Sequence, residues 1–201
     1  MEVFEPNIKF LDHPKLLISL HGDQQEIEAV HDYWNPSRFY NHIVAIPLAS
    51  EVAFTDGHTW SDVTSGVTEL KSHYDQLITK YNMNKIDITL CSFSGGTSVA
   101  LEAVLNKDIE VTNLIFVAPP LPNLEDLKEK LSILKECNIS VYILCGDKDT
   151  RFLPVAKKFA SYLKDLDVHY KLNIARDTKH EYPTDFDSVL LDMKKFLNFN
   201  L

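Results

Sequence analysis

Apolar runs typical of strands alternate with helix-period segments along almost the whole chain, and this alternation limits the folds open to it. The strand-like runs cover residues 16–20, 43–46, 86–91, 114–117, 141–145 and 168–174. Several are apolar at every position instead of every second one, which is typical of parallel strands covered on both faces. We therefore predict an α/β fold in three layers, a doubly wound and mostly parallel sheet of about six strands.

The segments between these runs have the spacing of helices. The predicted helices cover about residues 24–33, 61–81, 94–105, 124–137 and 185–197, with a further helix that begins near Leu153. In the longest of them, apolar residues recur at intervals of three and four. The 201 residues suit one domain with a sizeable core, and no repeat or interdomain linker interrupts them. We expect a single domain over residues 1–201.

Composition and charge exclude several functional classes. The chain has 29 acidic and 20 basic residues, a formal charge of −9, and no long basic run. Neither nucleic acid nor an anionic membrane surface is therefore an expected partner. The first residues lack the basic and apolar regions of a signal peptide, and no apolar run is long enough to span a membrane. A cytoplasmic location is expected.

The three cysteines are predicted to be reduced and buried. Cys91, Cys137 and Cys145 are an odd number without metal-ligand spacing, and each lies within or beside an apolar stretch. Cys91 and Cys145 end the third and fifth predicted strands. An intervening strand should hold them about 10 Å apart, which is beyond the reach of a disulfide.

A short motif follows the third predicted strand. In Ser92-Phe93-Ser94-Gly95-Gly96, a small residue stands two places before Ser94 and a glycine two places after it. This is the spacing of a nucleophile elbow, a tight strand-to-helix turn that lifts one side chain out of the sheet. The same residues also fit a simple glycine-shaped loop, so the motif needs support from other parts of the chain.

Chemically active residues follow several of the predicted strands. In open α/β sheets, ligands bind beyond the carboxyl ends of the strands. The residues at these positions are His21, Gly22, Asp23, Ser94, Asp147, Asp149 and His180. A serine, an acid and a histidine thus occur in the chain order of an α/β-hydrolase triad.

Each candidate has a chemical role and a plainer alternative. His180 would take the proton of Ser94 during attack, and Asp149 would fix the tautomer of the histidine. The backbone N–H groups of Gly95 and Asp23 would stabilise the oxyanion. Alternatively, His180 is a surface histidine and the turn before Asp23 is only a turn. Asp147 competes with Asp149, and either could cap the helix that follows.

On these residues, the chain resembles the carboxylesterase/phospholipase group of α/β-hydrolases, which includes the acyl-protein thioesterases. The resembling pieces run from residue 16 to 197 and comprise residues 20–22, 59–62, 92–96, 146–149 and 179–181. The resemblance implies a compact α/β-hydrolase fold and a serine esterase or thioesterase that uses no cofactor. It also implies that Asp149 is the triad acid, because the family uses the second acidic position of a Gly-x-x-Asp turn.

Two departures from the family pattern support a second hypothesis. The family usually has Gly-Phe-Ser-Gln-Gly-Gly at the elbow, whereas this chain has Ser92 and then Gly95-Gly96 after the serine. Asp23 places an acidic side chain beside the expected oxyanion site, where it would disfavour a negative intermediate unless it points away. The alternative is therefore an inactive α/β-hydrolase-fold protein with a binding or regulatory function.

The loops indicate an open site for a small ester or thioester. Only residues 118–123 separate the fourth strand from the next helix, which leaves no room for a lid domain. Trp60 and Leu121 are the candidate substrate-binding side chains, suited to a short or medium acyl group. No metal-binding, phosphate-binding or dinucleotide-binding motif occurs, so no metal is assigned. The oligomeric state stays open, with a homodimer as one option.

Overall fold

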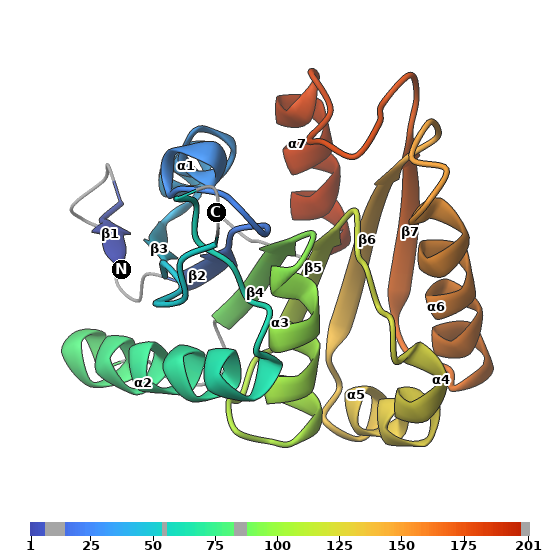
Figure 1. Ribbon diagram of the computed structural model, residues 1–201, viewed down its shortest axis with the longest axis horizontal. Helices are drawn as coiled ribbons and strands as arrows, with labels where there is room; N and C mark the ends of the chain where they lie inside the picture. The colour runs from blue at the N-terminus through green and yellow to red at the C-terminus, as the bar shows by residue number, and fades with distance from the viewer. Residues whose placement is uncertain (7–14, 54–55, 83–87, 198–201) are drawn as a thin grey trace.

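The computed structural model describes residues 1–6, 15–53, 56–82 and 88–197 (Figure 1). Within them, one sheet has the strand order β1-β3-β2-β4-β5-β6-β7. The strands are β1 Glu2–Phe4, β2 Lys15–Leu20, β3 His42–Ile46, β4 Ile88–Phe93, β5 Asn113–Val117, β6 Ser140–Gly146 and β7 Tyr170–Ala175. Strands β2 to β7 pair in parallel, and β1 pairs antiparallel with β3. The mostly parallel sheet is the predicted one.

Among the strands of the described residues, the sequence missed only the edge strand β1. The six predicted strands correspond to β2 to β7, although the start of the third lies outside the described residues. Strand β1 has three residues, and they pair with residues 44–46 of β3. A strand this short is stabilised by its partner and not by its own apolar pattern, so local sequence does not reveal it.

Helices cover both faces of this sheet. They are α1 Glu28–Trp34, α2 Val63–Tyr81, α3 Gly96–Leu105, α4 Leu124–Leu127, α5 Ser132–Glu136, α6 Leu153–Asp165 and α7 Phe186–Phe196. One apolar cluster joins the sheet to α2, α3 and α6, and a second joins the other face to α1 and α7 (Figure 1). The sheet is therefore the middle of three layers, as predicted.

Two predicted helices differ in the structure. The segment expected as one helix over 124–137 consists of α4, a 3-10 turn over Lys128–Leu131, and α5. This break leaves both Leu131 and Leu134 fully buried in the core. The first helix begins at Glu28 and not near Gln24, because the Gln25 backbone pairs with that of His58 through two hydrogen bonds of 3.2 Å.

The cysteines test the predicted strand order. Strand β5 lies between β4, which carries Cys91, and β6, which carries Cys145. All three cysteines are free, and Cys91 and Cys145 are buried. Cys137 is exposed just after α5, so its expected burial was wrong. Among the described residues, no helix is both long and apolar enough to cross a membrane.

Candidate active site

Ser94 lies at the tight turn between β4 and α3. Its φ of 45° falls in the left-handed region, which is uncommon for a residue with a side chain. The Ser94 N–H donates to the Val117 carbonyl at 3.0 Å, and the Ser94 carbonyl accepts from the Thr97 N–H at 2.9 Å. Neighbouring strand and helix thus hold the serine in an unfavourable conformation, which is the backbone geometry expected of a nucleophile elbow.

The structure brings Ser94, His180 and Asp149 together. Ser94 Oγ lies 2.8 Å from His180 Nε2, and His180 Nδ1 lies 2.7 Å from Asp149 Oδ2. The three residues follow β4, β7 and β6, whose carboxyl ends share one edge of the sheet (Figure 1). Asp149 is only 4% exposed, whereas the His180 side chain is 36% exposed. The acid is therefore shielded from water while the imidazole can meet a substrate.

Local contacts fix the carboxylate of Asp149. Its Oδ1 accepts the Phe152 N–H at 3.1 Å, which leaves Oδ2 for His180. The Cys145 thiol lies 4.0 Å from the same Oδ2, and burial together with the Asp149 charge raises the pKa of this thiol to about 12. Asp147, the competing acid, is exposed. Of the two acids that the sequence left open, Asp149 is the one that contacts His180.

A close approach of two loops makes the contact between Asp149 and His180 possible. A side chain at Gly146 would overlap the carbonyl of Thr178, so only glycine fits there. The Lys148 N–H donates to the same Thr178 carbonyl at 2.9 Å. The turn that carries Asp149 is thereby fastened to the loop that carries His180.

Aromatic packing orients the histidine ring. The His180 ring contacts the rings of both Phe93 and Phe152, with ring centroids 5.3 Å and 4.7 Å away. Phe93 in turn stacks at 4.9 Å on buried Tyr182, whose hydroxyl accepts the Trp34 indole N–H at 3.2 Å. Sequence reasoning missed Tyr182. An aromatic residue two places after the candidate histidine was the only signal for it.

A buried histidine shapes the first loop of the site. His21 is fully buried; its Nδ1–H donates to the Gly22 carbonyl at 2.6 Å, and its Nε2 accepts the Ala49 N–H at 3.1 Å. This pattern requires a neutral ring with the proton on Nδ1. Burial lowers the pKa of His21 and so favours that neutral form. The Trp60 indole N–H also donates to the His21 carbonyl, at 3.0 Å.

The carboxylate of Asp23 does not point away from the nucleophile turn. Its Oδ1 accepts both the Thr59 hydroxyl at 2.8 Å and the Trp60 N–H at 3.0 Å. A Cβ added to Gly95 would overlap all three atoms of this carboxylate. The acid at position 23 and the glycine after Ser94 therefore depend on one another, because the carboxylate fills the space that a larger residue at position 95 would need.

Trp60 and Leu121 have little surface to offer a substrate. Trp60 is 3% exposed and Leu121 is 4% exposed, and both belong to the core cluster beneath α2 and α3. That they bind the acyl group of a substrate stays a prediction. Trp60 supports the site, because its backbone N–H binds Asp23 and its indole binds the His21 carbonyl.

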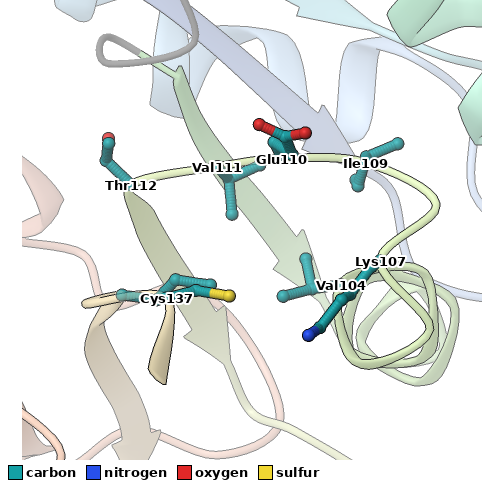
Figure 2. Close-up of a pocket in the computed structure, with 8 residues that line it drawn as sticks. Val104, Lys107, Ile109, Glu110, Val111, Thr112 and Cys137 are labelled. Atoms are coloured by element: carbon teal, nitrogen blue, oxygen red, sulfur yellow. The ribbon is translucent and has the colours of Figure 1, made fainter. Parts of the chain in front are cut away.

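A cavity of about 320 Å³ lies elsewhere in the protein. Figure 2 shows side chains that line it. Its lining residues precede β5 and β6, at the amino ends of these strands. They are Val104, Lys107, Ile109, Glu110, Val111, Thr112, Cys137 and Ile139. The cavity thus opens at the opposite edge of the sheet from Ser94, and we assign it no part in the chemistry at that residue.

The packing of Asp23 on Gly95 predicts a paired mutational effect. Gly95→Ala should destabilise the protein by about 1–3 kcal/mol, because the new methyl group displaces the carboxylate from its two donors. In an Asp23→Ala background, Gly95→Ala should lower the free energy of unfolding much less, since Gly95 already has helical dihedrals that alanine tolerates. Urea unfolding of the four proteins gives the coupling free energy. An equal cost in both backgrounds would contradict this packing.

The chain is similar to several solved structures. No family model and no curated protein matches the chain. Among solved structures, an uncharacterized protein from Bacillus cereus ATCC 10987 is 34% identical, with a TM-score of 0.88. That match covers 96% of this chain and 63% of the other, so this chain spans less than two thirds of that protein.

Two further structures carry the name of an esterase. Esterase PE8 is 18% identical, with a TM-score of 0.78, and the match covers 97% of each chain. The Bacillus cereus carboxylesterase is 13% identical, with a TM-score of 0.71 and coverage of 97% of this chain and 93% of that one. With the sheet order and the strand-to-helix turn at Ser94, these likenesses show that the chain has the α/β-hydrolase fold.

Proposed function

We propose that this protein is a serine hydrolase that cleaves carboxylic esters or thioesters with short to medium acyl groups. The observation that carries the proposal is the continuous chain of contacts from Ser94 Oγ to His180 Nε2 at 2.8 Å and from His180 Nδ1 to Asp149 Oδ2 at 2.7 Å. These are the distances at which a histidine can take a serine proton while an acid holds its ring.

The first half of the proposed reaction forms an acyl-enzyme. Ser94 Oγ attacks the carbonyl carbon as its proton passes to His180 Nε2, and Asp149 stabilises the resulting imidazolium. The N–H groups of Gly95 and Asp23 are the proposed donors to the oxyanion. Collapse of the tetrahedral intermediate breaks the bond to the alcohol or thiol, which leaves with the proton from His180.

The second half returns the enzyme to its starting state. A water molecule gives a proton to His180 Nε2 and attacks the acyl carbon. Collapse of the second tetrahedral intermediate breaks the bond to Ser94 Oγ, which regains its proton from His180. The carboxylic acid is released. Each proton in this cycle moves through His180, and backbone N–H groups of this chain stabilise the oxyanion in both halves.

The surroundings of Ser94 support small substrates. Only residues 118–123 connect β5 to α4, and the His180 side chain is open to solvent. An uncovered site suits a short or medium acyl group, because a long one would leave most of its surface in water. The names of esterase PE8 and of the Bacillus cereus carboxylesterase also favour an ester as the substrate.

One observation favours an inactive binding protein instead. The Asp23 carboxylate lies over Gly95, next to the proposed oxyanion position. A negative charge there opposes the charge that develops during acyl transfer. Against this alternative, His180 lies within hydrogen-bond distance of Ser94, a contact that a protein without activity does not need.

A panel of para-nitrophenyl esters and acyl thioesters, together with a fluorophosphonate probe, separates the two functions. We expect turnover of the shorter esters, and labelling that peptide mass spectrometry assigns to Ser94. Circular dichroism confirms that the protein assayed is folded. A folded protein that neither hydrolyses any member of the panel nor reacts with the probe would refute the hydrolase and favour the binding protein.

A further inference from the structure

Asp23 is a fixed and exposed negative charge beside Ser94. The residue is exposed, yet its carboxylate cannot swing freely, because Oδ1 accepts hydrogen bonds from both Thr59 and Trp60. The other oxygen, Oδ2, lies against Gly95, the residue that follows Ser94. Because Gly95 adjoins Ser94 in the chain, this carboxylate lies against the turn at which a substrate carbonyl would react.

The charged residues around Asp23 do not neutralise the negative charge of its carboxylate. In the part of the chain that the structure describes, no lysine or arginine forms an ion pair with this carboxylate. The segment that holds it, Thr59-Trp60, also lines a cavity of about 280 Å³ whose charged lining residues are Glu51, Asp62 and Glu69. The chain as a whole carries a formal charge of −9. A region with charges of one sign concentrates ions of the opposite sign.

We propose that Asp23 makes the enzyme selective for esters or thioesters that carry an ammonium group within a few atoms of the reacting carbonyl. The inference rests on the hydrolase function proposed above and names its substrate class. An uncharged ester leaves the Asp23 charge uncompensated beside the developing oxyanion. A cationic substrate brings its own counterion, and an anionic one adds a second repulsive charge.

This arrangement acts mainly on the transition state. The oxyanion is absent from the bound substrate and develops on the way to the tetrahedral intermediate, so neutralising Asp23 lowers the barrier in addition to favouring binding. An opposite charge about 5 Å away at the effective dielectric of a protein surface is worth about tenfold or more in kcat/KM. Because Asp23 is exposed, added salt should weaken the preference.

Two isosteric substrate pairs test the inference, one for each side of the scissile bond. The acyl pair is the para-nitrophenyl ester of trimethylammonio-butanoic acid and that of its neutral tert-butyl isostere. The leaving-group pair is acetylthiocholine and its neutral tert-butyl isostere. The wild-type protein should prefer the cationic member of at least one pair by about tenfold in kcat/KM, and the preference should decline with salt.

A charge-removing variant then locates the effect. Asp23→Asn should bring the ratio of kcat/KM for the cationic substrate to kcat/KM for its neutral isostere close to one. Asp32→Asn removes the same charge on α1, where the Asp32 side chain is 89% exposed, and should leave the ratio unchanged. The ratio within one variant cancels any change in overall turnover. The wild-type ratio and its salt dependence test the inference even if Asp23→Asn does not fold.

The outcomes separate this inference from the function on which it rests. Turnover of the neutral esters with a ratio near one in both pairs would overturn the role of Asp23 and leave the hydrolase standing. A strong preference that survives Asp23→Asn would overturn it as well. If the folded protein hydrolyses neither pair and resists the fluorophosphonate, the hydrolase function itself fails, and the substrate class fails with it.

Discussion

Ser94→Ala is expected to lower kcat for ester hydrolysis by roughly 10⁴-fold to 10⁶-fold, as removal of a triad nucleophile does elsewhere. The proposed covalent step needs the Oγ that lies 2.8 Å from His180 Nε2. The change should not unfold the protein, because alanine has the same Cβ as serine at this positive φ. Steady-state kinetics with a para-nitrophenyl ester and labelling by fluorophosphonate measure the loss.

Ser98 provides the matched control for this substitution. It lies in α3, the helix that follows Ser94, and its hydroxyl donates to the Pro120 carbonyl at 3.3 Å. Ser98→Ala should keep kcat within a few-fold of wild type and should still be labelled. If Ser94→Ala instead kept a large part of the activity, the nucleophile would be another residue and the proposed mechanism would be wrong.

Asp149→Asn is expected to lower kcat by about 10⁴-fold, because an amide in this position favours the wrong tautomer of the histidine. The carboxylate Oδ2 now accepts a hydrogen bond from His180 Nδ1. An asparagine N–H would donate to Nδ1 and move the ring proton to Nε2, which could no longer accept the proton of Ser94. Single-turnover acylation with a para-nitrophenyl ester measures the effect on the step itself.

The competing acid at position 147 is the natural comparison. Asp147 is exposed and lies in the same turn after β6 as Asp149. Asp147→Asn should leave acylation nearly unchanged, although it removes the same charge two residues away. Equal losses in both variants would mean that the turn as a whole, and not the contact with His180, determines the rate.

The layers and the three contacting residues could be predicted because their signals are local. Strands covered on both faces need apolar side chains at every position, and that requirement is visible in runs such as residues 141–145. In a parallel sheet, the residues that follow successive strands gather at one edge. Ser94 and His180 were therefore found from their positions after predicted strands, whereas the choice of Asp149 over Asp147 came from the family resemblance. The structure places Ser94, His180 and Asp149 in contact.

Other features depend on partners that are distant in sequence. Strand β1 exists because β3 offers it an edge, and α1 starts late because Gln25 pairs with His58. Trp60 was predicted from the sequence as a substrate-binding residue, and the structure places it in the core cluster. No local pattern distinguishes an aromatic side chain that faces a pocket from one that faces the core.

The chain order of serine, acid and histidine, the strand-to-helix turn at Ser94 and the doubly wound sheet were all determined by the sequence alone, because they follow from local spacing and burial. The direction of the Asp23 carboxylate was decided only by the tertiary structure. Its donors, Thr59 and Trp60, lie 36 and 37 residues away, and Gly95 leaves the space that the carboxylate occupies. A side chain has several rotamers of similar energy, so hydrogen bonds and packing from distant segments determine which one it adopts.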